Sequence, residues 1–201
     1  MTDNRPKKGS TIKVEPIRDP AKLRKIERML AENPRNYALF VVGCNTALRA
    51  SDLVNIRIGD VRHLQPGDSW TVREIKTRRF RKDRRITLNK KAHRAVQALL
   101  DTLPEERRAD TMPLFQSLRG GAKLTVGHVH KLVKSWCRQV KLPGNYGSHT
   151  LRKSFGYHQR VSFGVGLAEL VDVFGHSTQT ETLEYLCIQP EEIRDIYMNE
   201  I

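Results

Sequence analysis

Apolar residues recur at intervals of three or four positions along most of this 201-residue chain, which is the periodicity of amphipathic helices. Leu23, Ile26 and Leu30 follow this spacing after Pro20, and proline is favoured at the first position of a helix. An Asn-Pro pair at positions 33 and 34 then begins a second helix. The pattern predicts amphipathic helices from residue 20, over residues 34–47, 90–103 and 125–140, and from residue 189 to 201.

The segment 34–47 is apolar on nearly all sides, so we expect it to lie at the centre of the fold. It runs into the motif T-A-L-R-A-S-D-L, in which Arg49 directly follows the buried helix. Ser51 is expected to cap a short next helix, which would hold Arg49 between two rigid elements. Asp52 either orients Arg49 or is a first-turn carboxylate that the helix dipole favours.

Short runs rich in β-branched and aromatic residues predict three strands, over residues 61–64, 70–76 and 84–88. A Gln-Pro-Gly-Asp turn follows the first of them. The predicted fold class is therefore α+β, mainly α-helical, with a small three-stranded antiparallel sheet.

The charge of the chain predicts a polyanionic partner. Lys and Arg number 36 against 22 Asp and Glu, which gives a net charge of +14. The densest run, residues 73–85, has eight basic and two acidic residues within the predicted hairpin. This run is either a highly solvated hairpin or, as its apolar neighbours favour, a basic face for a phosphate backbone. No apolar run is long enough to span a bilayer, so nucleic acid is favoured over a membrane surface.

Residues 1–19 are rich in proline and lysine and are predicted to form a flexible basic N-terminal arm. The arm either tracks a phosphate backbone or is a solvated tail. Residues 20–201 are sufficient for one hydrophobic core and are expected to form a single domain.

The three cysteines, Cys44, Cys137 and Cys187, are far apart and are expected to be reduced core residues of an intracellular protein. A zinc site from His128, His130 and Cys137 is disfavoured, because residues two apart on a helix point to different faces.

A group of polar side chains is suited to one reactive site. His149 and Arg152 are three apart and share a face of a helical turn. His176 follows a glycine at the end of an apolar helix, and Tyr185 comes nine residues later between two leucines. A phenol at that place either packs in the core or acts as a nucleophile. The full set of candidates is Arg49, Lys76, His149, Arg152, His176 and Tyr185.

Positively charged donors together with a phenol suit attack on a phosphodiester. Arginines hold the charge of the non-bridging oxygens without titrating, and a lysine can protonate the leaving 5′ oxygen. The phenol has an ordinary pKa of about 10 and needs a base or a positive field to react. The sequence has no Gly-x-x-x-x-Gly-Lys phosphate loop and no Gly-x-Ser-x-Gly elbow.

In these motifs the sequence resembles the catalytic domain of the tyrosine recombinases, or phage integrases, over roughly residues 20–201. T-A-L-R-A-S-D-L is similar to the first-arginine motif of the family, H-T-L-R to its H-x-x-R box, and F-G-H-S followed by Tyr185 to its G-H…Y box. Lys76 lies in a predicted strand hairpin, as the catalytic lysine of the family does.

The resemblance implies a role for each candidate residue. Tyr185 would attack the scissile phosphate and form a 3′-phosphotyrosyl link, while Arg49 and Arg152 clamp the phosphate oxygens. His149 would assist proton transfer at the nucleophile, and His176 would hydrogen-bond the phosphate. Lys76 would be the general acid. Candidate DNA contacts are Arg78, Arg79, Arg81, Lys82 and Lys153.

The resemblance also implies a site-specific recombinase that needs no metal, ATP or other cofactor. Such an enzyme would act on double-stranded DNA as a homo-tetramer joined through the C-terminal helix, with accessory DNA-bending proteins, in the cytoplasm at the nucleoid of a bacterium or phage host. The family's separate helical DNA-binding domain is missing, so we expect either a minimal single-domain member or a fragment. Two alternatives remain open: strand cleavage and rejoining of the type IB topoisomerase kind, and a catalytically silent DNA-binding regulator.

Overall fold

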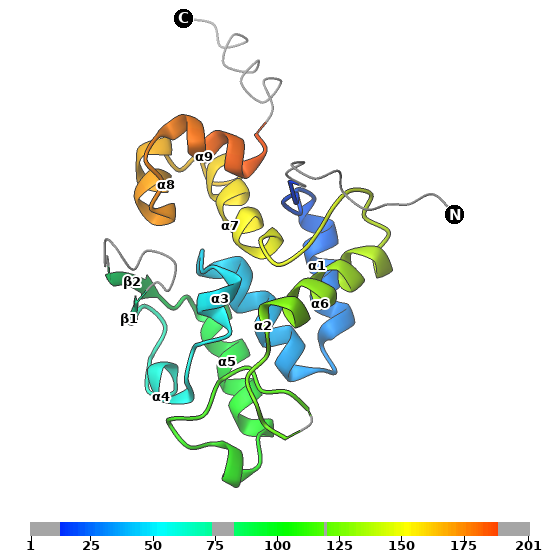
Figure 1. Cartoon of the computed structure of the whole chain (residues 1–201), viewed down its shortest axis with the longest axis vertical. Coiled ribbons are helices and arrows are strands. Elements are labelled where there is room, and N and C mark those ends of the chain that lie inside the picture. The colour runs from blue at the N-terminus through cyan, green and yellow to red at the C-terminus, as the bar shows by residue number, and fades with distance from the viewer. Residues whose placement is uncertain (1–12, 74–82, 119, 189–201) are drawn as a thin grey trace, which may run out of the picture.

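The computed structural model describes residues 13–73, 83–118 and 120–188 and is mainly helical (Figure 1). The predicted mainly helical α+β class is confirmed, but in the described residues the sheet has two strands rather than three. In chain order the elements are α1 (Pro20–Leu30), α2 (Pro34–Asn45), α3 (Ala50–Leu53), α4 (Ile58–Val61), β1 (Ser69–Arg73), β2 (Asp83–Thr87), α5 (Lys90–Thr102), the 3-10 turn η1 (Glu105–Arg107), α6 (Val126–Gln139), α7 (Thr150–Val161), α8 (Leu167–Phe174) and α9 (Gln179–Leu186).

The apolar helix α2 lies at the centre of the main core, as predicted. It begins at Pro34, and the side chain of Asn33 caps it by accepting a hydrogen bond from the backbone N–H of Asn36. It packs against α1, α5 and α7. Phe40 meets Trp136 of α6 edge to face, with ring centroids 5.9 Å apart. No helix in the described part of the chain is long and apolar enough to cross a bilayer.

The predicted strand over residues 61–64 is wrong, because this segment is the end of α4 and the turn after it. Ile58, Val61 and Leu64 are buried, whereas Arg62 and His63 are exposed. Burial at every third residue is the spacing of a helix, and a strand would bury every second residue. A run this short carries too little periodicity for the sequence to separate the two structures.

The remaining two strands form an antiparallel hairpin in which Trp70 pairs with Ile86. Both side chains are buried, so one face of the sheet is packed against the core. Arg84 of β2 donates a hydrogen bond to the carbonyl of Val173 in α8, which ties the sheet to that helix near the segment that connects the two strands. Residues 74–82, which join the strands, lie outside the described residues, as does the predicted helix from residue 189 to 201.

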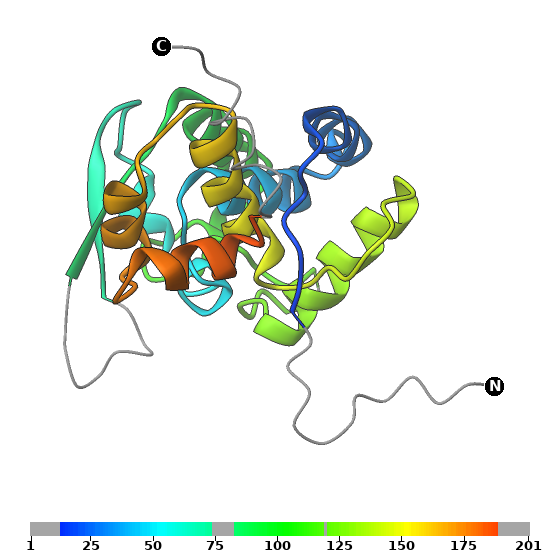
Figure 2. The same ribbon diagram turned by 90° about the horizontal axis from the view of Figure 1, so that it is seen from above.

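Residues 13–19 do not belong to a flexible arm. They form an extended segment, here called the N-terminal strap, which runs along α7 and past the end of α9 (Figure 2). Ile17 is fully buried, and its N–H donates to Ser154 Oγ at 2.8 Å. The Ile17 carbonyl lies 2.9 Å from His158 Nε2, and Arg18 donates to the carbonyl of Cys187 at 2.7 Å. The prediction extended the arm too far, because a single buried isoleucine among prolines gives no periodic signal.

A second, smaller core joins α7, α8 and α9. It contains Leu170, Phe174 and Leu186, together with Ala47 from the loop before α3. Gly156 of α7 lets these elements approach closely, since a Cβ there would lie 2.5 Å from Phe174 Cζ and 2.6 Å from Leu186 Cδ2. The candidate residues of α8 and α9 therefore depend on a close contact that only glycine permits.

Replacing Gly156 by alanine should lower the free energy of unfolding by about 1–3 kcal/mol, the usual result of forcing extra volume into a packed core. Urea unfolding followed by circular dichroism measures this change. Gly127→Ala in α6 is the matched control, because its Cβ would meet only Thr125 Oγ1 at 3.9 Å. That variant should be at least as stable as the wild type, since alanine is the better helix former. Equal stability of Gly156→Ala and the wild type would contradict the close packing.

Candidate active site

The fold brings five of the six candidate residues to one place. Arg49 is the N-cap of α3, His149 is the N-cap of α7, and Arg152 lies in the first turn of α7. His176 lies in the turn between α8 and α9, and Tyr185 is in the last turn of α9. These residues come from three separate parts of the chain and converge around the Tyr185 ring.

Two predicted groups are not placed by the structure. Lys76, the predicted general acid, lies outside the described residues. So do four of the five predicted DNA contacts, namely Arg78, Arg79, Arg81 and Lys82.

Arg152 is the structural centre of the site. Its side chain is 2% exposed, although it carries a permanent charge. Its guanidinium donates to the carbonyl of Ala47 and, at 2.8 Å, to the carbonyl of Phe174. It also lies over the Phe174 ring, with Cζ 4.6 Å from the ring centroid. One side chain thus joins the loop before α3 to α7 and α8.

Arg49 is held by the start of α3, although not in the way the sequence suggested. The expected cap residue Ser51 lies inside the helix, and Arg49 itself occupies the N-cap position with extended backbone. Its carbonyl accepts the first hydrogen bonds of the helix, from the backbone N–H groups of Asp52 and Leu53. The helix cap lies two residues earlier than predicted, so Arg49 is part of the element that positions it.

His149 is the nearest candidate base to the phenol. Its Nδ1 lies 3.4 Å from Tyr185 Oη, and the imidazole is exposed. The turn before it is fixed by a hydrogen bond from the backbone N–H of Gly147 to Thr150 Oγ1. An exposed imidazole at this distance can take the phenol proton and pass it to solvent.

His176 is held by a left-handed turn and by its neighbours. Gly175 ends α8 with φ 63°, a conformation that favours glycine. The imidazole stacks on Phe174 at 5.3 Å, and its Nδ1 lies 3.0 Å from Thr182 Oγ1. Burial lowers the pKa of His176, and the charges of Arg152 and Arg49 lower it further against the opposing effect of Glu181.

Opposing effects act on Tyr185. Its side chain is half-buried, and this burial raises the pKa of the phenol. Arg152 lowers the pKa through its charge and a hydrogen bond, and the charge of Arg49 lowers it as well. The cations therefore oppose the desolvation that would otherwise keep the phenol protonated.

The structure does not place Lys153, the fifth predicted DNA contact, on the surface. Its side chain is 5% exposed and turns inward from α7. The ammonium lies 4.8 Å from the Tyr185 ring centroid and 3.4 Å from Cys187 Sγ. A side chain buried in this way does not lie on the surface where a phosphate backbone would pass.

Sequence reasoning also missed Thr182 and Arg18, which hold His176 and the end of α9. Neither belongs to a local motif. The spacing of His176 and Thr182 across a predicted turn was the one signal for the first of them.

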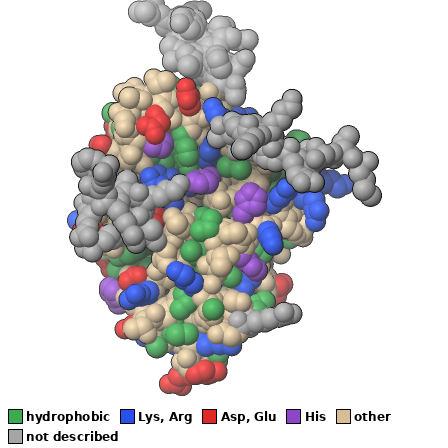
Figure 3. Space-filling model, viewed as in Figure 1, with side chains coloured by type: hydrophobic (Ala, Val, Ile, Leu, Met, Phe, Trp, Pro, Cys, Tyr) green, Lys and Arg blue, Asp and Glu red, His purple; other side chains and the backbone are tan. Residues whose placement is uncertain are grey.

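The surface around the site is rich in positive charge. On the face seen in Figure 3, Lys, Arg and His side chains lie across the middle of the molecule, between α3 and the α8–α9 pair. Acidic side chains on this face lie mostly toward its upper and lower ends. This distribution matches the expectation of a polyanionic partner.

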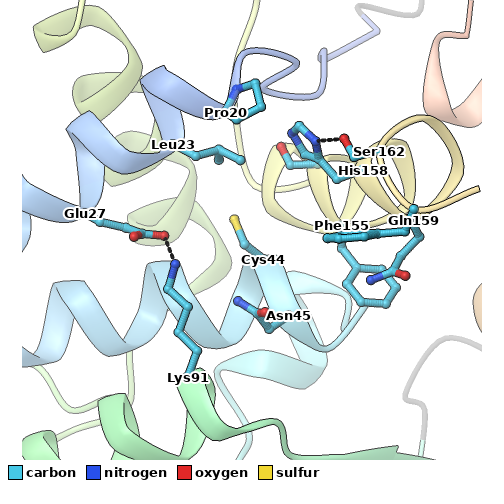
Figure 4. A pocket seen from close by; sticks show the side chains of 12 residues that line it. Pro20, Leu23, Glu27, Cys44, Asn45, Lys91, Phe155, His158, Gln159 and Ser162 are labelled. Atoms are coloured by element: carbon cyan, nitrogen blue, oxygen red, sulfur yellow. Dashed lines mark hydrogen bonds and ion pairs between the residues drawn. The ribbon is translucent and has the colours of Figure 1, made fainter.

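A separate cavity of about 350 Å³ lies between α1, α2, α5 and α7 (Figure 4). It contains the paired side chains of Glu27 and Lys91, which are 2.6 Å apart, and the sulfur of Cys44. Burial raises the pKa of the Cys44 thiol, so it is not a reactive thiolate. None of the candidate residues lines this cavity, and the geometry gives it no part in the reaction.

Several known proteins are similar to this chain in sequence. The profile of the phage integrase family matches residues 21–192. The chain is 30% identical over 187 residues to the probable integrase/recombinase YoeC of Bacillus subtilis, covering 92% of this chain and 95% of that protein. It is also 30% identical over 162 residues to the tyrosine recombinase XerC of Caldanaerobacter subterraneus, covering 80% of this chain and 43% of that protein.

Solved structures have the same fold. The XerA recombinase matches with a TM-score of 0.73 at 21% identity, over 92% of this chain and 65% of that chain. The XerH recombinase bound to a palindromic difH substrate matches with a TM-score of 0.70 at 19% identity, over 89% of this chain and 51% of that chain. The chain thus spans nearly all of YoeC but only 43% to 65% of the length of these Xer proteins.

The lowered pKa of His176 predicts a pH-dependent stability. The ordinary pKa of histidine is about 6.5. As the pH falls through this value, His176 binds a proton in the unfolded chain before it does so in the folded chain. The free energy of unfolding should therefore fall as the pH drops from neutral through this value, and part of that fall should vanish in His176→Asn. Urea unfolding of both proteins across this pH range measures the difference, and the six other histidines cancel in the comparison. Parallel curves would contradict the lowered pKa.

Proposed function

This chain belongs to the phage integrase family of tyrosine recombinases, and we propose that it cuts and rejoins double-stranded DNA through a covalent link to Tyr185. The observation that carries the proposal is the 3.4 Å approach of His149 Nδ1 to Tyr185 Oη, beside two arginines whose charges oppose the rise that burial causes in the pKa of the phenol. A phenol with a proton acceptor and permanent cations has the parts of an oxygen nucleophile for phosphoryl transfer.

Cleavage would proceed by in-line displacement at phosphorus. The oxygen of Tyr185 forms a bond to phosphorus and passes its proton to His149, while the bond from phosphorus to the 5′ oxygen breaks. Arg49 and Arg152 hold the non-bridging oxygens, whose charge grows in the transition state. The leaving 5′ oxygen takes a proton from Lys76. The product is a 3′-phosphotyrosyl link and a free 5′ hydroxyl.

His176 is suited to bind the same phosphate. The Thr182 hydroxyl donates to the carbonyl of Thr178, so its oxygen can accept from His176 Nδ1, which lies 3.0 Å away. Protonation of the ring then lets Nε2 donate to a non-bridging oxygen of the phosphate. Approach of the anion also favours the charged imidazolium, against the effect of burial.

Rejoining reverses these steps. A 5′ hydroxyl attacks the phosphotyrosyl link, and the Tyr185 phenolate leaves. One phosphodiester bond is exchanged for another, so the cycle requires no ATP, and the arginines supply the charge that a metal would otherwise provide.

We infer the oligomeric state, the partners and the cellular location of the protein from its family. We expect a homo-tetramer on DNA that uses residues 189–201 for contacts between subunits, with accessory DNA-bending proteins, in the cytoplasm at the nucleoid. The likeness to XerC and YoeC supports recombination over the strand rotation of a type IB topoisomerase. The basic face between α3 and the α8–α9 pair supports binding of a DNA backbone.

Covalent trapping tests the proposal. Nicked duplexes bearing sites from the DNA that flanks the gene should yield a detergent-resistant protein–DNA adduct in the presence of a metal chelator. Tyr185→Phe should form none, because it lacks the attacking oxygen. Tyr37→Phe in α2 is the matched control and should retain the adduct. An adduct formed by Tyr185→Phe would overturn the assignment of the nucleophile.

A second test concerns the general acid. Lys76→Ala should slow cleavage by about 10²–10⁴-fold, the usual contribution of general acid catalysis. A substrate with sulfur in place of the leaving 5′ oxygen should restore the rate, because a thiolate leaves without a proton. Lys82→Ala, in the same segment, should be affected equally on both substrates. Failure of sulfur to rescue Lys76→Ala would assign the acid to another residue.

A further inference from the structure

Two adjacent residues of α7 place cations on different sides of the small core that holds Tyr185. Arg152 reaches the carbonyls of Ala47 and Phe174, whereas Lys153 reaches the C-terminal end of α9. The function proposed above uses the first cation and gives no role to the second. Lys153 is nevertheless 5% exposed, so its ammonium is held away from solvent.

The surroundings of this ammonium are unusual for a buried charge. Among the described residues it contacts two groups, Cys187 Sγ at 3.4 Å and the face of the Tyr185 ring, whose centroid is 4.8 Å away. Buried charges are normally paired with an opposite charge. Neither Arg62–Asp110 nor Lys91–Glu27, two ion pairs within the described ranges, involves Lys153. The partner best suited to this ammonium is the negative charge that Tyr185 acquires during the reaction.

The end of α9 is built to keep this contact. Cys187 follows the last turn with φ 56°, in the left-handed region. Its carbonyl accepts a hydrogen bond from Arg18 of the N-terminal strap at 2.7 Å, and its sulfur accepts from Lys153. The ammonium is therefore fixed against both the ring of Tyr185 and the residue that terminates its helix.

We propose that Lys153 is a positioning residue for the reaction, whose buried ammonium holds the Tyr185 ring and stabilises the phenolate. This inference rests on the function proposed above, because it takes Tyr185 as the nucleophile. In cleavage the phenol loses its proton and bonds to phosphorus as the 5′ oxygen departs and gains a proton. In rejoining the phenolate departs as the 5′ oxygen bonds to phosphorus. A cation on the ring face lowers the energy of the phenolate in both directions.

Other groups act on the same phenol and must be held constant in any test. Five groups face Tyr185. Arg49 comes from the start of α3, and His149 and Arg152 come from α7. His176 comes from the turn between α8 and α9, and Cys187 is the C-cap of α9 itself. Arg152 also lies over the Tyr185 ring, with Cζ 6.0 Å from the centroid, but the Lys153 ammonium is nearer, at 4.8 Å, and is not needed to hold a phosphate oxygen. Its removal should therefore change the ionisation of the phenol even without DNA.

The first experiment measures that ionisation in the free protein. With tyrosine labelled at the ring carbon that bears the oxygen, nuclear magnetic resonance follows each of the five tyrosines through a pH titration. Lys153→Met keeps the length and apolar stem of the side chain but removes its charge. It should raise the titration midpoint of Tyr185 by about one pH unit, the size of a desolvated cation–π contact. Lys153→Arg should return the midpoint toward the wild-type value.

The second experiment measures single-turnover cleavage as a function of pH. Lys153→Met should cleave about 10-fold more slowly at neutral pH, and the rising limb of its profile should move upward by the same interval as the midpoint. Lys25→Met, which removes an exposed charge from α1, controls for weaker attraction of DNA and should leave the profile unchanged. Lys153→Gln gives the same comparison should Lys153→Met melt below the assay temperature.

The outcomes separate the two proposals. An unchanged Tyr185 midpoint in a folded, charge-free variant overturns the role of Lys153, whatever the activity. A slower reaction with an unshifted pH profile also overturns it, because a purely structural defect lowers the rate equally at every pH. Adduct formation by Tyr185→Phe would instead refute the proposed function and leave the titration result standing.

Discussion

The site depends on a single buried guanidinium. Arg152 donates to the carbonyls of Ala47 and Phe174 and stacks on the Phe174 ring, so it fixes three segments that are far apart in sequence. A buried charge is tolerated only where hydrogen bonds replace those of water. The two carbonyls supply that replacement, and in doing so they orient the loop that carries Arg49 and the turn that carries His176. The same residue thus organises the small core and supplies charge to the site.

The phenol is held between two opposing effects. Burial against Phe174 and Leu186 fixes the ring but raises the pKa of its oxygen, whereas Arg49 and Arg152 lower it. A fully exposed tyrosine would ionise no less readily but would have no fixed direction, and a fully buried one would be inert. Half-burial beside cations gives both orientation and reactivity, which is why the small core and the charges occur together.

The sequence revealed those parts of the site that carry local signatures. Arg49, Arg152 and Tyr185 stand in short motifs, and the apolar helix α2 has an unmistakable pattern. The prediction of a strand over residues 61–64 was wrong because so short a run does not show whether every second or every third residue is buried. Arg18 contacts Cys187, which is 169 positions away, and Lys153 contacts the same residue from 34 positions away. No spacing rule reaches across such intervals, so only the folded chain could show that the N-terminal strap contacts the end of α9 and that a buried lysine lies against Tyr185.

The division of the core into two clusters bears on how the site responds to its substrate. Tyr185 lies in α9, an eight-residue helix that packs on the smaller cluster rather than on the main core around α2. A helix this short is not stable alone and depends on its tertiary contacts. Of the residues in α9 only Thr182 and Leu186 are buried, so α9 should open with a lower free energy than the whole domain. An anion bound between Arg49, Arg152 and His176 favours the closed arrangement by mass action. Binding of an anion at this place and ordering of α9, with Tyr185 in it, are therefore one equilibrium.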